Sequence, residues 1–145
     1  MNQHGLKFHH FGLATKSPDR ARAFLAGLGY RPDHEIFDPN QKVHVQLAKS
    51  DSMPTVELIW PGPAPGPLDG FFKKRDSLVY HLCFETTDLL GSLLSIESTS
   101  RATCISAPQP AVLFDGSRVS FYEIAGFGMI EIIERAARAA SSGGE

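Results

Sequence analysis

Four polar residues stand within otherwise apolar stretches of the sequence, and all four are of types that bind divalent metal ions: His10, Glu57, His81 and Glu131. Glu57 lies in VELIW and Glu131 in MIEII, and such apolar runs are typical of buried β-strands. A buried carboxylate is costly unless it is paired, solvated or bound to a metal. One such Glu is most often exposed at a sheet edge, but four coincident exceptions favour a shared metal site.

The spacing of these residues indicates an internal duplication. His81 follows His10 by 71 residues (81 − 10), and Glu131 follows Glu57 by 74 residues (131 − 57). A shift that is nearly constant across both pairs is typical of a repeated module. Each half is too small to bury its own sheet face, so we expect the two halves to share one core.

The elements that must position the four residues recur in the same order in each half. Two helices are expected. The first, Ser17–Leu28, begins with the start signal Ser-Pro-Asp, and the second, Asp88–Thr99, begins at the Asp of Thr-Asp. Strands are expected over 8–14, 31–37, 42–48, 53–60, 78–85, 102–106, 118–122 and 128–133. The fold class is therefore α+β, with residues 1–145 forming a single domain. Its parts are module 1 (7–60), a Pro/Gly-rich linker (61–77), module 2 (78–134) and a flexible tail (135–145).

Strand alternation separates the polar residues from their bulky neighbours. Sets such as Phe11/Leu13 and Val56/Leu58 would pack under the helices, which leaves the histidines and glutamates on the opposite, concave face. Two imidazoles and two carboxylates suit a divalent ion such as Ni, Co, Zn, Mn or Fe. Cys83 shares the face of His81, so it either lines the pocket or serves as inert packing.

The motifs HHFGLA, TVELIWPG, VYHLCFETTD and GMIEIIE resemble the four ligand strands of the vicinal oxygen chelate superfamily, which includes glyoxalase I, methylmalonyl-CoA epimerase and extradiol dioxygenases. The resemblance covers nearly the whole chain. It implies two tandem βαβββ modules whose curved, eight-stranded mixed sheet surrounds one metal ion. It also implies His10, Glu57, His81 and Glu131 as the metal ligands, in the order found in bacterial glyoxalase I.

Two departures from the family pattern bear on the substrate. Ala14 and Pro61 stand where glyoxalase I usually has a cationic residue and an Asn that contact glutathione, so glutathione is not favoured. The additional catalytic Glu of the epimerases falls near Val45, and a shift of one residue would place His44 or Gln46 there instead. The residues expected to line the pocket are His44, Gln46, Cys83 and Tyr122.

The chemistry expected of such a centre is proton abstraction next to a carbonyl. A chelated divalent ion stabilises the enolate or enediolate of a small carbonyl or thioester substrate, and a carboxylate beside it moves the proton. By resemblance to glyoxalase I, Glu131 is the expected base and Glu57 its catalytic partner. Two alternatives stay open: an Fe(II) extradiol-type dioxygenase, against which Glu57 counts as a fourth ligand, and a non-catalytic, resistance-type binding protein.

Bulk properties exclude several other classes of function. The net charge of −2, with no basic run longer than Lys73–Arg75, argues against binding to nucleic acid or to an anionic membrane. No apolar stretch approaches the roughly 18 residues of a membrane span, and the N-terminus lacks the apolar core of a signal peptide. Two cysteines without metal-ligand spacing suit a cytoplasmic protein. A homodimer is expected from the resemblance.

Overall fold

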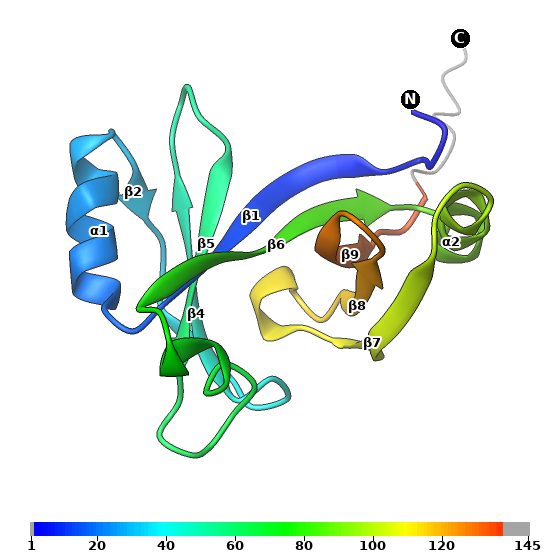
Figure 1. Ribbon diagram of the computed structural model, residues 1–145. Helices are drawn as coiled ribbons and strands as arrows, with labels where there is room; N and C mark the ends of the chain where they lie inside the picture. Colours follow the sequence, from blue (N-terminus) through cyan, green and yellow to red (C-terminus); the bar gives the residue numbers. More distant parts are fainter. Residues whose placement is uncertain (1, 138–145) are drawn as a thin grey trace, which may run out of the picture.

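The structure is a computed structural model, and it describes residues 2–137. One mixed sheet runs through the molecule, with a helix near each end of it (Figure 1). The first half contains β1 (Lys7–Thr15), α1 (Pro18–Gly27), β2 (Arg31–Pro32), β3 (Ile36–Asp38), β4 (Val43–Lys49) and β5 (Thr55–Pro61). A short 3₁₀ turn, η1 (Phe71–Lys73), lies between the halves. The second half contains β6 (Ser77–Thr86), α2 (Leu89–Glu97), β7 (Ala102–Pro110), η2 (Val112–Phe114), β8 (Arg118–Ile124) and β9 (Gly128–Glu134).

The strand order shows the duplication directly. It runs β2-β4-β5-β1-β6-β9-β8-β7, with β3 also pairing with β4. In each half the first strand pairs in parallel with the last strand, β1 with β5 and β6 with β9. The halves meet where β1 and β6 pair antiparallel, so their first strands lie side by side at the centre of the sheet (Figure 1). The predicted pair of βαβββ modules is confirmed.

Within residues 2–137 the sheet has nine strands rather than the predicted eight, because the strand expected over 31–37 is interrupted. Arg31–Pro32 and Ile36–Asp38 pair with opposite ends of β4, and the regular pairing is interrupted between them, although the Asp33 N–H still donates to the Leu47 carbonyl at 2.8 Å. The predicted tail over 135–145 begins with an anchored residue, since the Arg135 N–H donates to the Thr86 carbonyl at 2.8 Å. Residues 138–145 lie outside the described part of the chain.

The two helices begin in the same way, 71 residues apart. The Thr15 hydroxyl accepts from the Ser17 N–H at 2.9 Å, and the Thr86 hydroxyl accepts from the Asp88 N–H at 3.0 Å. Asp88 then caps α2 by accepting from the Gly91 N–H. These bonds fix the turn from each first strand into its helix. In residues 2–137 no helix is long and apolar enough to cross a membrane.

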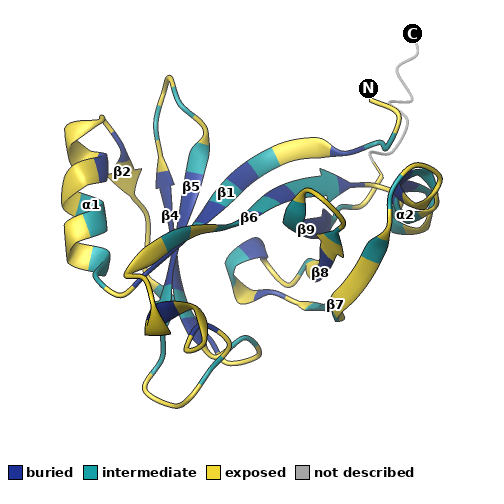
Figure 2. Ribbon diagram, in the orientation of Figure 1, coloured by how far each residue is buried: buried dark blue, intermediate teal, exposed yellow. Residues whose placement is uncertain are grey.

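Apolar clusters occupy both faces of the sheet. Much of β4 and β5 is buried between them (Figure 2). Under the helices, Leu25 of α1 packs with Val56 and Leu58, while Ile96 of α2 packs with Ile130 and Ile132. The opposite, inner face has its own apolar side chains, including Val45, Leu47, Ile59, Val119 and Phe121. The core is therefore two-layered around the central strands, and a polar group on the inner face is surrounded by hydrocarbon.

Candidate metal centre

The four residues singled out by the sequence meet at one point on the inner face. His10 and His81 come from the paired first strands, and Glu57 and Glu131 come from the last strand of each half. One ligand atom from each residue lies within 4.8 Å of the corresponding atom of every other. All four side chains are buried, with no residue more than 5% exposed.

The distances within this cluster match the spacing of atoms that share one ion. Each imidazole Nε2 lies near the Oε1 of both carboxylates: His10 to Glu57 3.3 Å, His10 to Glu131 3.4 Å, His81 to Glu57 3.3 Å and His81 to Glu131 3.0 Å. Ligand atoms about 2.0–2.2 Å from one ion are about 3 Å apart at octahedral angles and about 3.4 Å apart at tetrahedral angles. The cluster therefore has the size of a first coordination sphere.

Several of these atoms have no hydrogen-bond partner within the described chain, namely Nε2 of His10, Nε2 of His81 and Oε1 of Glu131. Buried polar atoms are nearly always hydrogen-bonded, so three orphans facing one another need an explanation. An ion bound between them would satisfy all three. The donor set of two imidazoles and two carboxylates fits a borderline divalent metal.

Without a metal, the cluster is a network of opposite charges. Burial alone would lower the pKa of His81, but the negative charges of Glu131 and Glu57 outweigh burial and raise it to about 9. The same balance raises the pKa of His10. Burial opposes ionisation of Glu131, yet the two histidines hold its pKa well below the usual value. Binding of a cation therefore competes with protons on the imidazoles.

Three of the four residues expected to line the pocket lie on the helix-covered face of the sheet, opposite the cluster. His44 and Gln46 of β4 pair with Trp60 and Leu58 of β5, which places them on the α1 side of the sheet. His44 stacks on Trp60 with ring centroids 5.4 Å apart, and Gln46 accepts a hydrogen bond from Arg22. Their expected place at the pocket is thus corrected.

Tyr122 is likewise on the opposite side of the sheet, in the apolar cluster that contains Ile96 of α2. Its neighbour in β8, Phe121, pairs with Glu131 and faces inward. Cys83 does lie on the inner face, paired with Glu131 in the ladder, but it is fully buried among apolar side chains. Cys83 therefore packs against the centre and is not exposed to a cavity.

Two aromatic residues beside the centre were not found from the sequence. His9 lies next to His10 and forms a hydrogen bond with its ring, because the strand is irregular at this point. Phe114 of η2 stacks on the His10 ring with centroids 5.7 Å apart and an interplanar angle of 23°. Alternation in a regular strand would point His9 away from His10, and no periodic pattern marks Phe114.

The fold is shared with solved structures across nearly their whole length. A methylmalonyl-CoA epimerase from Mycobacterium tuberculosis is 24% identical, with a TM-score of 0.70 over 92% of this chain and 89% of that chain. A hypothetical protein from Bacillus halodurans is 21% identical, with a TM-score of 0.75 over 93% of this chain and 98% of that chain. A Streptomyces coelicolor methylmalonyl-CoA epimerase in complex with 2-nitronate-propionyl-CoA is 19% identical, with a TM-score of 0.63 over 90% and 98% of the two chains.

No curated protein matches the sequence. The family model of the glyoxalase/bleomycin resistance protein/dioxygenase superfamily matches residues 9–121, which is more than half of the chain. The resemblance of the four strand motifs to the vicinal oxygen chelate superfamily is thereby confirmed. On the match of this model, the chain belongs to the glyoxalase/bleomycin resistance protein/dioxygenase superfamily.

Proposed function

We propose that the protein is a divalent-metal-dependent isomerase or epimerase that removes a proton next to a carbonyl group. The observation that carries this proposal is the buried cluster of His10, Glu57, His81 and Glu131, whose nitrogen–oxygen distances of 3.0–3.4 Å suit ligands of a single ion. Family membership and the likeness to epimerase structures support it.

In this proposal the four side chains hold the ion from both halves of the sheet. The identity of the ion stays open among Ni, Co, Zn, Mn and Fe. When bound, such an ion acts as a Lewis acid that stabilises negative charge on neighbouring substrate oxygens. The apolar side chains around the centre, Leu47 and Phe121 among them, exclude water and so strengthen this electrostatic effect.

The proton is moved by a carboxylate of the cluster, and Glu131 is the proposed base. By the family resemblance, the strand position at which the epimerases have an additional Glu falls near Val45, and Val45 packs in the inner apolar cluster with Ile59 and Phe72. The neighbouring polar residues of β4 face the other side of the sheet, so they offer no replacement. Glu57 lies in the equivalent position of the other half, where it can return a proton from the opposite face.

The proposed substrate is a small carbonyl compound or a thioester. Two solved epimerase structures contain coenzyme A compounds, one with methylmalonyl-CoA and NH₄⁺ and one with 2-nitronate-propionyl-CoA, which favours a CoA thioester as the first compound to test. Ala14 is fully buried and apolar, so it offers no cation for the carboxylates of glutathione.

The alternatives are weaker for structural reasons. An extradiol-type dioxygenase needs open positions beside two histidines and one carboxylate, and here Glu57 is as close to both imidazoles as a fourth ligand would be. A metal-free binding protein would have no use for four buried ligand side chains facing one another.

Deuterium wash-in tests the proposed reaction. Metal-loaded wild-type protein is incubated in D₂O with methylmalonyl-CoA, and deuterium at the carbon between the two carbonyls is followed by NMR. Glu131→Gln should slow exchange by about 10²- to 10⁴-fold, because the amide does not accept the proton. The exposed Glu123→Gln on the neighbouring strand is the matched control and should exchange normally. Cleavage of a catechol without exchange of any carbonyl compound would contradict the proposal and favour the dioxygenase.

We further propose a homodimer, as is usual in this superfamily, which light scattering of the purified protein would test. The expected cytoplasmic location stays a prediction.

A further inference from the structure

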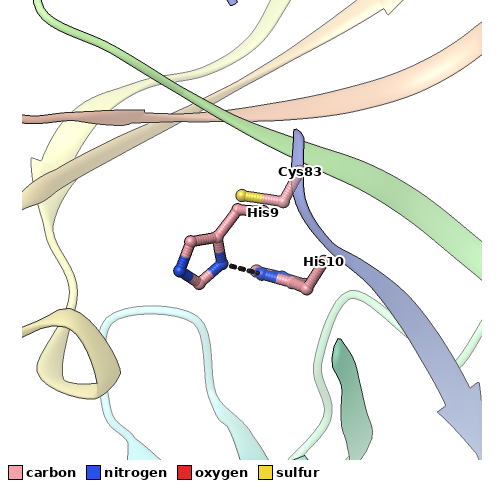
Figure 3. Close-up of side chains that lie close together, drawn as sticks. All are labelled: His9, His10 and Cys83. Atoms are coloured by element: carbon pink, nitrogen blue, oxygen red, sulfur yellow. Dashed lines mark hydrogen bonds between the residues drawn. The ribbon is translucent and has the colours of Figure 1, made fainter. Parts of the chain in front are cut away.

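His9 reaches the metal centre because β1 contains a β-bulge. In the β1–β6 ladder Phe8 pairs with Phe84 and His10 pairs with Cys83, so two steps along β1 match one step along β6. The extra residue is His9. A bulge reorients side chains that alternation would send to opposite faces, and bulges are frequent next to active sites. Figure 3 shows the result: a nitrogen of the His9 ring points at a nitrogen of the His10 ring, with the two ring planes at 79°.

The two rings are joined by a hydrogen bond between their Nδ1 atoms, 2.7 Å apart. Such a bond needs one donor and one acceptor. Nε2 of His10 points at the two carboxylates, so it is the atom available to an ion, and the ring proton must then be on Nδ1. His10 therefore donates through Nδ1–H, and His9 accepts through its own Nδ1.

We propose that His9 is a positioning residue for the metal centre: it holds the His10 ring so that Nε2, free of its proton, faces the ion. This inference rests on the proposed metal site and adds an outer contact to it. Ligating histidines commonly donate their second N–H to a neighbouring group, which fixes both the tautomer and the orientation of the ring. Here the partner is another histidine rather than a carboxylate.

Phe114 holds both rings in place from η2. It packs edge-on against His9, with centroids 5.5 Å apart and planes at 89°, and stacks on His10. The Arg135 guanidinium lies 5.9 Å from the centroid of the Phe114 ring. These contacts limit rotation of both rings, and the hydrogen bond keeps the two Nδ1 atoms pointed at each other.

The contact between His9 and His10 could instead belong to a second metal site formed with Cys83, since one ligand atom from each of the three residues lies within 4.8 Å of the others. Two nitrogens bound to one tetrahedral ion are about 3.3 Å apart, and 2.7 Å is too short for such a pair. The Cys83 thiol is directed at the Phe84 carbonyl, at 3.7 Å. The geometry is that of a hydrogen bond.

The other half of the molecule offers an internal comparison. Gly12 pairs with His81 and Leu13 pairs with Val79, so Tyr80 is the extra residue of a second bulge, 71 positions after His9. Tyr80 packs edge-on against His81, with centroids 5.4 Å apart. Nδ1 of His81, however, has no partner within the described chain. The bulge is duplicated, but among the described residues the supporting hydrogen bond is present at His10 and absent at His81.

Three variants test the role of His9. His9→Phe keeps an aromatic ring beside Phe114 without an acceptor, whereas the amide oxygen of His9→Gln can still accept from His10. Tyr80→Phe at the equivalent bulge is the matched control. We expect His9→Phe to weaken Zn²⁺ binding by about 10- to 100-fold in competition with a chromophoric chelator. His9→Gln should restore most of this affinity, and Tyr80→Phe should leave it unchanged.

NMR of the ring nitrogens separates this inference from the proposed metal site. In the metal-free protein the His10 Nδ1–H should give a downfield proton signal, protected from exchange with water, that His9→Phe removes. If wild-type protein shows this signal but binds no Zn²⁺, the proposed metal site is refuted while the hydrogen bond between His9 and His10 is supported. The role of His9 is overturned if the signal is missing, or if Zn²⁺ affinity is the same in His9→Phe and wild type. It is also overturned if His9→Gln binds as weakly as His9→Phe, or if wild type binds two Zn²⁺ and His9→Phe only one.

Discussion

Gly12 lies directly opposite His81 in the β1–β6 ladder, and the His81 ring occupies the space that a side chain on residue 12 would need. A Cβ at Gly12 would be 2.5 Å from Cε1 and 2.8 Å from both nitrogens of that ring. Cys83, the equivalent of Gly12 in the other half, lies opposite His10 and retains a side chain. The glycine thus gives the His81 imidazole its place in the cluster.

Gly12→Ala should therefore displace His81. The ring is packed edge-on against Phe121 and Tyr80, so moving away from a new methyl group costs about 1–3 kcal/mol of stability. Zn²⁺ affinity should fall at least about tenfold, as measured by chelator competition. Gly27→Ala in α1 is the control, since its Cβ would meet no atom within 4 Å. Normal Zn²⁺ affinity in Gly12→Ala would show that His81 does not need its present position.

Removal of an imidazole should release the metal. Purified wild-type protein is expected to hold about one divalent ion per chain, and His81→Ala should lose it, because three ligands remain and one corner opens. His44→Ala is the matched control: this histidine stacks on Trp60 on the other face of the sheet and should have no effect. Metal content after dialysis against a chelator measures the difference. Equal retention in His81→Ala and wild type would place the ion elsewhere.

The stability of the metal-free protein should fall between pH 6.5 and 9. The pKa of His81 is about 9 in the folded chain, against 6.5 for an unperturbed histidine. A raised pKa stabilises the fold fully below about pH 6.5, and this contribution is lost as the pH rises through about 9. The loss is on the order of 3 kcal/mol. Chemical denaturation with a chelator present measures it, and unchanged stability across this range would mean that His81 is not charged in the folded state.

Metal affinity should change with pH in the opposite direction. An ion must displace the proton held by His81, so its apparent affinity should rise with pH until about pH 9. Binding at pH 7 should release protons, which calorimetry in buffers of different ionisation enthalpy detects. Proton uptake, or affinity independent of pH from 6 to 9, would contradict the assignment of His81 as a ligand.

The inward orientation of the two cluster glutamates was predictable because β5 and β9, the strands that carry them, pair without register shifts. Glu57 and Glu131 stand among bulky residues that pack under the helices, so strand geometry alone turns the carboxylates to the inner face. The helix starts at Ser17 and Asp88 were predictable for a similar reason, since their capping residues are local signals.

The misplaced pocket residues and the bulges could not be predicted in the same way. A polar residue on a strand suggests a pocket, but Gln46 is buried under α1 because Arg22 provides its partner, a contact between distant parts of the chain. The bulges at His9 and Tyr80 contain no glycine, and they arise from the antiparallel pairing of two modules. That pairing is visible only in the tertiary structure, and it is what brings His9 to the site.

We propose that the four buried side chains of the cluster form one metal centre. The most direct test of this proposal is a crystal structure of the protein loaded with Co²⁺ or Ni²⁺, with data collected at the absorption edge of the metal. We expect one anomalous peak on the inner face, about 2.0–2.2 Å from Nε2 of His10, Nε2 of His81 and an oxygen of each of Glu57 and Glu131. A peak at any other place, or carboxylates turned away from the two imidazoles in the presence of saturating metal, would contradict it.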